Sequence, residues 1–242
     1  MVGLLALVIV IDKPEHAHWL DDREKQLVLA DLEADRREAG PREHGLTQAL
    51  KLPQVWLLTL IHFCALSSNL TIGFWIPTII QGLNVKNTVT IGLLSTVPFI
   101  AALVGMVLVS RHSDRTLERR YHAALPCLCC AAGLVGIGVF AETHVLAFAA
   151  IIVAVTGALC YNGPFWQIPP TLLTGTAAAG GIALINSLGN LSGWLGPSVV
   201  GWLEDVTGKT AAGLYVVVGL EVVGAVLILL FMPRGSIKTR TE

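Results

Sequence analysis

Four polar side chains lie inside long apolar stretches of the sequence, at Asn69, Trp166, Gln167 and Asn186. An amide without a partner is costly in hydrocarbon, so we expect these side chains to face protein or water. An indole offers a flat apolar face and an amide offers both a donor and an acceptor, which suits a hydroxylated organic acid. The sequence therefore predicts a substrate-binding role for these four residues. The alternative is that buried amides only link neighbouring helices, for about 0.6 kcal/mol each.

Trp166 and Asn186 share a predicted depth in the membrane. They are 20 residues apart, on two apolar stretches joined by a short connection. About ten residues on each side of that turn, at about 1.5 Å per residue, place both near 15 Å, the midplane of a bilayer. Secondary transporters bind their substrates at this depth.

A charged cluster occupies one short connection and contains Asp114, Arg115, Arg119 and Arg120. Basic residues in such a connection fix the orientation of a membrane protein, which is the simpler interpretation. An acidic residue is not needed for that purpose, and a carboxylate beside a helix N-terminus gains about 0.3–1 kcal/mol. We therefore expect Asp114 to hold the ends of helices together, with Arg115 as its ion-pair partner or as a ligand of lipid phosphate.

Other reactive residues do not form a catalytic set. Glu221 lies near the middle of the last apolar stretch, where we favour a structural carboxyl over a proton-coupling role. The cysteines Cys127, Cys129 and Cys130 are spaced so that a helix spreads them around its axis. We predict no metal ion, no cofactor and no enzymatic activity.

Composition assigns the chain to the membrane. Of its 242 residues 54% are hydrophobic and only 14% charged, too few charges to cover a soluble domain. The formal net charge of −1 excludes a nucleic-acid footprint. Five cysteines, all within apolar runs, do not form a disulfide framework.

The apolar stretches predict an all-α membrane protein with a bundle of six transmembrane helices in residues 53–232. The six predicted spans are 53–81, 88–110, 121–141, 145–168, 177–203 and 213–232. Residues 1–11 are interpreted as the remnant of a preceding transmembrane helix. Residues 12–52 are interpreted as a cytoplasmic linker with an amphipathic helix, which a capping box at Asp21 and Glu24 begins. Residues 233–242 form a predicted cytoplasmic tail.

The distribution of Lys and Arg predicts the orientation. With alternating spans, 14 of the 16 basic residues fall on one face, and the positive-inside rule makes that face cytoplasmic. We therefore expect a multi-pass protein of the inner (cell) membrane with both ends in the cytoplasm.

Two stretches resemble the major facilitator superfamily. The connection from Ser110 to Arg120 resembles the family's loop signature in the form SDRxxERR. The stretch from Gly163 to Asn190, followed by Gly196-Pro197, is similar to the last helices of the anion:cation symporter branch. That branch includes tartrate, phthalate, glucarate and galactonate permeases. The family usually has glycines where Ser110 and Leu117 stand, so this loop is less permissive.

The resemblance implies the C-terminal half of a carrier with twelve spans in two six-helix halves. It implies alternating access, a small organic anion as substrate, protons as the coupled ion and substrate contacts at Trp166 and Asn186. It also implies that the connection around Asp114 is a cytoplasmic latch, which holds the outward-facing state.

Two hypotheses remain open. The first is a secondary active transporter, or its C-terminal half, for a hydroxylated dicarboxylate or sugar acid. The second is a truncated half-transporter that is inactive alone and acts as a binding or assembly partner in the lipid bilayer. The second has support because the N-terminal half is missing and no Lys or Arg lies within the six spans to meet a carboxylate.

Overall fold

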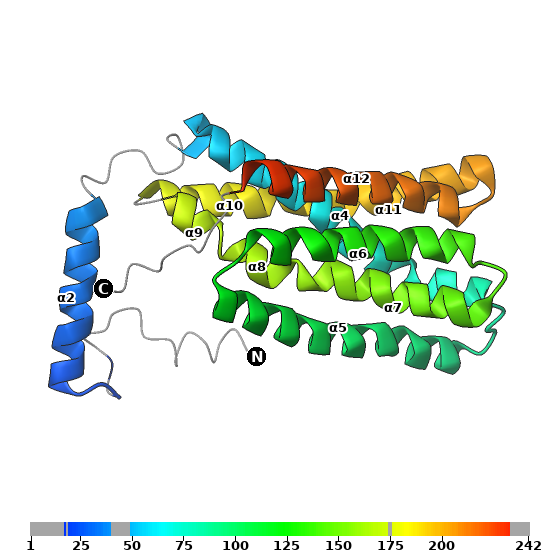
Figure 1. Cartoon of the computed structure of the whole chain (residues 1–242), viewed down its shortest axis with the longest axis horizontal. Helices are drawn as coiled ribbons and strands as arrows, with labels where there is room; N and C mark the ends of the chain where they lie inside the picture. The colour runs from blue at the N-terminus through cyan, green and yellow to red at the C-terminus, as the bar shows by residue number, and fades with distance from the viewer. Residues whose placement is uncertain (1–16, 18, 40–48, 174–175, 233–242) are drawn as a thin grey trace.

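The computed structural model describes residues 17, 19–39, 49–173 and 176–232. All regular elements in those ranges are helices, as Figure 1 shows. The expectations for residues 1–11 and 233–242 lie outside the described residues. The helices are α2 (Asp22–Ala39), α4 (Pro53–Gly82), α5 (Thr88–Thr116), α6 (Arg120–Val139), α7 (His144–Cys160), α8 (Asn162–Trp166), α9 (Pro169–Leu172), α10 (Thr176–Asn190), α11 (Ser192–Thr207) and α12 (Thr210–Phe231).

Helix α2 precedes the bundle and begins with a reciprocal cap. The amide of Asp21 donates to Oε2 of Glu24 at 3.1 Å, and the amide of Glu24 donates to Oδ1 of Asp21 at 2.7 Å. Two of the free amides at the helix start are thereby satisfied.

Five stretches of the described chain are long and apolar enough to cross a membrane: α4, α5, α6, the run His144–Leu172 and α12. The fifth predicted span, 177–203, is divided into α10 and α11, which follow one another along the bundle in Figure 1. Side chains compete for the backbone at the division. The side-chain amide of Asn190 donates through Nδ2 to the backbone carbonyl oxygen of Asn186 at 2.7 Å. The Ser192 hydroxyl donates to the backbone carbonyl oxygen of Gly189, also at 2.7 Å. Such bonds weaken the helical ladder.

The predicted span 145–168 is also interrupted, and proline explains where. Pro164 has no backbone N–H, so the carbonyl of Cys160 loses its helical partner just where α7 gives way to α8. Pro169 and Pro170 follow and begin the single turn of α9. Trp166 and Gln167 therefore lie on an irregular segment and not in the middle of a straight helix.

Helix α4 is the centre of the bundle. It contacts α10, α11 and α12 on several sides, and α7 and α5 on others. Helix α7 packs against both α6 and α5, so that α6 and α5 lie on its two sides. The tightest pairing is α6 with α7, where a Cβ on Gly157 would lie 2.5 Å from the Cys130 amide nitrogen. Only glycine allows this approach.

Candidate functional site

The interior of the bundle holds an aromatic cluster around a buried histidine. His62 of α4 is 2% exposed, and its ring lies parallel to that of Phe165 with the centroids 4.9 Å apart. The Trp166 indole meets the same ring edge-on, also at 4.9 Å. His62 Nδ1 lies 3.4 Å from the Tyr161 hydroxyl oxygen. Tyr161 at the α7–α8 junction and Phe165 and Trp166 of α8 thus surround one imidazole.

Helix α10 closes the cluster from another side. A Cβ on Gly189 would collide with the imidazole of His62, so α10 approaches this ring through its glycine. One turn earlier on the same helix lies Asn186, whose side chain is exposed. Its Oδ1 accepts a hydrogen bond from the Asn190 amide nitrogen at 3.0 Å. Asn186 therefore lies beside the cluster, and its own amide nitrogen points to no described acceptor.

The four predicted substrate residues are brought together only in part. Trp166 is half-buried and touches His62, while Asn186 and Gln167 are exposed at the edge of the same region. Asn69 is seven residues from His62, on the same face of α4 two turns further on. It lines a small crevice with Phe99 of α5 and Val155 of α7. The binding roles of these residues stay predictions.

His62 is the residue that the sequence analysis missed. No Lys or Arg lies within the predicted spans, and histidine was not considered as a cationic group there. His62 lies nine residues after Pro53, about 14 Å along α4. Every other Arg or His of α4–α12 lies within the first or last two turns of its helix. The position of His62 in the sequence, far from both ends of an apolar stretch, was the signal that could have identified it as a candidate.

The connection between α5 and α6 is held by an ion pair with a different partner from the one expected. Nη1 of Arg119 lies 2.6 Å from Oδ1 of Asp114 and also donates to the Ser113 hydroxyl at 2.9 Å. We expected Arg115 in this place. Arg115 lies in the last turn of α5, beside Asp114 in sequence, and neighbouring residues on a helix point in different directions. Arg119 reaches back to Asp114 after the chain has turned.

The turn itself requires a left-handed residue. Leu117 ends α5 with φ of 52° and ψ of 23°, a conformation that favours glycine. The family's usual glycine at this position is absent, and the leucine adopts the conformation all the same. Arg120 begins α6 and is 7% exposed, with its Nε unpartnered and its guanidinium 5.6 Å from the centroid of the Tyr121 ring.

A short polar chain links the two helix ends beside the ion pair. Oε2 of Glu118 lies 2.8 Å from His122 Nδ1, and His122 Nε2 lies 2.6 Å from His112 Nδ1. Partial burial of Glu118 acts to raise its pKa. Hydrogen bonds from the Tyr121 and His122 amides and from the His122 ring outweigh it and hold the pKa of Glu118 below its usual value.

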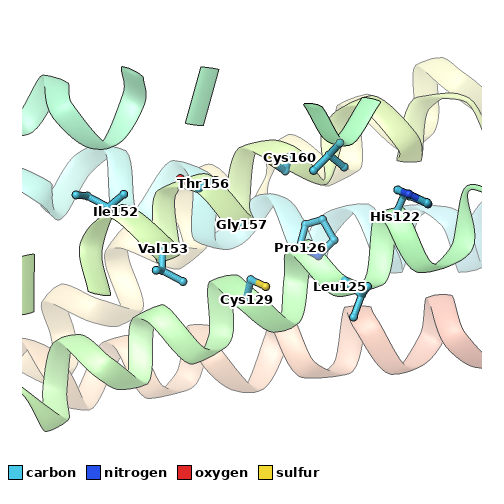
Figure 2. Close-up of a pocket in the computed structure, with 10 residues that line it drawn as sticks. His122, Leu125, Pro126, Cys129, Ile152, Val153, Thr156, Gly157 and Cys160 are labelled. Carbon is cyan, nitrogen blue, oxygen red and sulfur yellow. The ribbon is translucent and has the colours of Figure 1, made fainter. Parts of the chain in front are cut away.

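A groove of about 350 Å³ lies between α5, α6 and α7, away from the aromatic cluster. Figure 2 shows Leu125, Pro126 and Cys129 of α6 lining one side of it, with Val153 of α7 on another. His122 is its one ionisable ring, at one end of the groove. None of the predicted substrate residues lines it, and its apolar walls offer a polar solute no set of partners. We do not assign it as the substrate site.

Glu221 is enclosed between α12, α4 and α6. It is 1% exposed, its Oε1 has no partner, and the side chains of Ser68 and Cys127 lie near its carboxyl. No cationic group is among these neighbours. Within the described ranges, no three His, Cys, Asp or Glu residues are grouped as a metal site.

Comparison with known proteins identifies the family. A family model described as Major Facilitator Superfamily matches residues 1–197. A putative tartrate transporter of Agrobacterium vitis is 38% identical over 100% of this chain, which covers 54% of that relative. The putative metabolite transport protein NicT of Pseudomonas putida is 34% identical over 95% of this chain, which covers 52% of that relative. A quinolone resistance transporter of Acinetobacter baumannii is 35% identical over 88% of this chain, which covers 51% of that relative.

The chain spans about half the length of these curated relatives. All three are transporters by name, and the bundle has the apolar helices that a multi-pass membrane protein needs. Since the family model matches more than three quarters of the chain, this protein belongs to the Major Facilitator Superfamily.

Proposed function

We propose that the chain is the C-terminal six-helix half of a carrier for a small hydroxylated organic anion, a dicarboxylate or sugar acid, moved together with protons. The carrying observation is the aromatic cluster around His62, where Trp166 contacts this ring and Asn186, one turn before Gly189, is exposed. The identity of the Agrobacterium vitis relative, named a putative tartrate transporter, supports the choice of substrate class.

In this proposal the substrate lies against Trp166 and Asn186, with Gln167 and Asn69 at the edges of the same cavity. The indole takes the carbon skeleton, and the amides exchange hydrogen bonds with the hydroxyl groups. A second six-helix half supplies the facing wall. The two halves rock about the site, so that it opens to each side of the membrane in turn.

The ion pair of Asp114 with Arg119 is the proposed latch on the cytoplasmic side. It joins the end of α5 to the start of α6, where neighbouring helices of both halves must separate for the site to open inward. In this proposal the exposed Arg115 faces the lipid phosphates, whereas Arg120 is buried at the start of α6. With the basic connections on the cytoplasmic side, both chain ends lie in the cytoplasm of an inner-membrane protein.

An uptake assay tests the proposal. Cells lacking tartrate uptake would express this chain alone, or with the first six helices of the Agrobacterium vitis relative, and receive labelled tartrate and other hydroxy acids. We expect uptake with the partner half. Asn186→Ala should reduce it at least tenfold, and Gln81→Ala, an exposed amide at the end of α4, should not.

The outcomes separate the two hypotheses. Uptake by the chain alone establishes an autonomous carrier. Uptake only with the partner half establishes a half-transporter, which acts as an assembly partner. If well-expressed chains take up no organic anion in either arrangement, the proposed function is wrong.

A further inference from the structure

We propose that His62 is the group that receives the substrate's carboxylate, and that its imidazole takes up one proton when the anion binds. This inference rests on the proposed function, because it names the residue that meets the anion. It answers the difficulty that no Lys or Arg lies within the spans to neutralise a carboxylate.

The surroundings of His62 leave one nitrogen free for this role. Nδ1 faces the Tyr161 hydroxyl at 3.4 Å, and Nε2 has no hydrogen-bond partner among the described residues. A hydroxyl both donates and accepts, so Tyr161 can pair with Nδ1 in the neutral and in the protonated ring. In the neutral ring with its proton on Nδ1, Nδ1 donates to the Tyr161 oxygen, so protonation at Nε2 leaves that hydrogen bond as it is and gives Nε2 a proton to donate.

The ring is held in place independently of its charge. It is stacked on Phe165 at an interplanar angle of 5°, and α10 closes against it at Gly189. Trp166 is half-buried and meets the imidazole edge-on at 69°, and α10 lies beside Nε2 at Gly189. In this proposal a movement of the indole or of α10 opens Nε2 to a carboxylate whose hydroxyl groups reach the exposed Asn186.

The charge balance favours binding the proton and the anion together. A single charge in the middle of a membrane is costly, whether it is an imidazolium or a carboxylate. Side by side, each reduces the cost of the other. By linkage, the proton raises the affinity for the anion by the same factor as the anion raises the affinity for the proton.

The titratable groups around His62 are few. Tyr161 makes direct contact from the α7–α8 junction, and α8 and α10 present Phe165, Trp166 and Gly189. Behind Tyr161 lie the thiols of Cys64 on α4 and Cys127 on α6 and the carboxyl of Glu221 on α12, all in electrostatic contact with the tyrosine. The proton arrives from water, forms an N–H bond at Nε2, and leaves to water on the side where the anion is released. One proton thus crosses with each carboxylate that His62 meets.

Calorimetry of tartrate binding from pH 6 to pH 8 tests the inference. The full chain is used in lipid nanodiscs, with the partner half if uptake requires it. Both carboxyls of tartrate are ionised throughout this range, so a pH dependence reports on the protein. Titrations in two buffers of different ionisation enthalpy count the protons taken up.

For the wild type we expect about one proton taken up per tartrate at pH 8, and an affinity that falls about tenfold per pH unit once the ring is neutral. His62→Gln should bind at least tenfold more weakly at pH 6, with no proton uptake and no pH dependence. His144→Gln, which removes an exposed histidine at the start of α7, is the matched control and should behave as the wild type.

Two results would overturn the inference in different ways. If His62→Gln keeps the wild-type proton uptake and pH dependence, the inference is wrong and the proposed function stands. If the folded wild type binds neither tartrate nor any other hydroxy acid, both are wrong. Should His62→Gln fail to fold, the ¹⁵N resonances of His62 in the wild type give the same decision. They must shift to the protonated form on adding tartrate at pH 7, and an unchanged neutral ring would refute the proposal.

Discussion

Helices α4 and α5 are nearly equal in length and both strongly apolar, yet they are held in different ways. In the most apolar stretch of each helix, 61% of the residues are buried in α4 and 17% in α5. Glycines of α10, α11 and α12 bring these helices close to α4, through Gly189, Gly193, Gly196 and Gly224. Helix α5 instead presents large apolar side chains such as Leu103 and Leu108, each 62% exposed, on its outer surface.

Helix α5 is defined by its ends. At its start the side chain of Asn87 accepts hydrogen bonds from the amides of Val89 and Thr90. The Asp114–Arg119 ion pair lies at its C-terminal end, together with Leu117, whose backbone is left-handed. The difference teaches that close packing positions the proposed binding residues on α4, whereas caps and ion pairs set where α5 stops and the proposed latch begins.

The largest effect should come from closing the approach of α10 to α4. Gly189→Ala places a Cβ into the ring of His62, which cannot move away because it is stacked on Phe165. We expect a loss of about 3 kcal/mol in stability. The thermal unfolding midpoint of detergent-solubilised protein measures it. Gly73→Ala in α4, with open space around its Cβ position, is the control and should change stability by less than about 1 kcal/mol.

A pair of leucine truncations compares the two helices directly. Leu58→Ala removes a side chain of α4 that is 0% exposed and should cost about 2 kcal/mol. The Leu103 side chain on α5 is exposed to lipid tails in the folded and in the unfolded state. Leu103→Ala should therefore change the free energy of unfolding by less than about 0.5 kcal/mol. Denaturant titrations in one detergent measure both. Equal losses would show that α5 is as tightly packed as α4 and would break the comparison.

Breaking the ion pair should release the end of α5 by a smaller amount. Asp114→Asn removes the charge that Arg119 meets at 2.6 Å, and because the Asp114 side chain is 60% exposed we expect about 1 kcal/mol at most. The loss should shrink in 1 M salt, which screens exposed charges. Asp205→Asn, an exposed carboxylate at the end of α11, is the control. A loss that is insensitive to salt would mean that hydrogen bonding, and not charge, holds the turn.

Acid should weaken the same end through Glu118. Its folded-state pKa lies below the unfolded value, so its stabilising contribution is complete above about pH 4.5 and is lost as pH falls through the folded pKa. Glu118→Gln should therefore be less stable than the wild type at pH 6, by under about 1 kcal/mol, and the difference should shrink as the pH falls below 4.5. Unfolding midpoints over a series of acidic pH values measure it, and a difference that does not shrink in acid would contradict this assignment.

The smallest effect is a stabilisation. Leu117→Gly relieves the left-handed strain of about 1 kcal/mol, and glycine's greater unfolded-state entropy offsets part of the gain. We expect a net gain of about 0.5 kcal/mol, seen as a slightly higher unfolding midpoint. A loss would show that the Leu117 side chain makes contacts worth more than the strain.

The pattern of apolar residues predicted the helices well and their interruptions poorly. The bounds of α4, α5 and α12 lie close to the predicted spans, because apolar length is a property of the sequence. The break between α10 and α11 depends on side chains of Asn190 and Ser192 that bond to the backbone one turn away. Apolar length carries no information on such bonds.

The candidate site was predicted in its residue types and not in its arrangement. The indole of Trp166 and the amide of Asn186 were selected from the sequence, but His62, which packs against Trp166, was not. Likewise Asp114 was chosen as the centre of the latch, but Arg119 and not Arg115 became its partner.

The sequence by itself determined that this chain is a helical membrane protein of the Major Facilitator Superfamily, because hydropathy, basic residues and motifs are local and need no neighbour. The tertiary structure alone decided that His62 meets Trp166 and Gly189, that α4 is central and α5 peripheral, and which arginine Asp114 binds. Those relations join residues up to 127 positions apart, such as His62 and Gly189, and only the packing of helices around glycines brings them within contact.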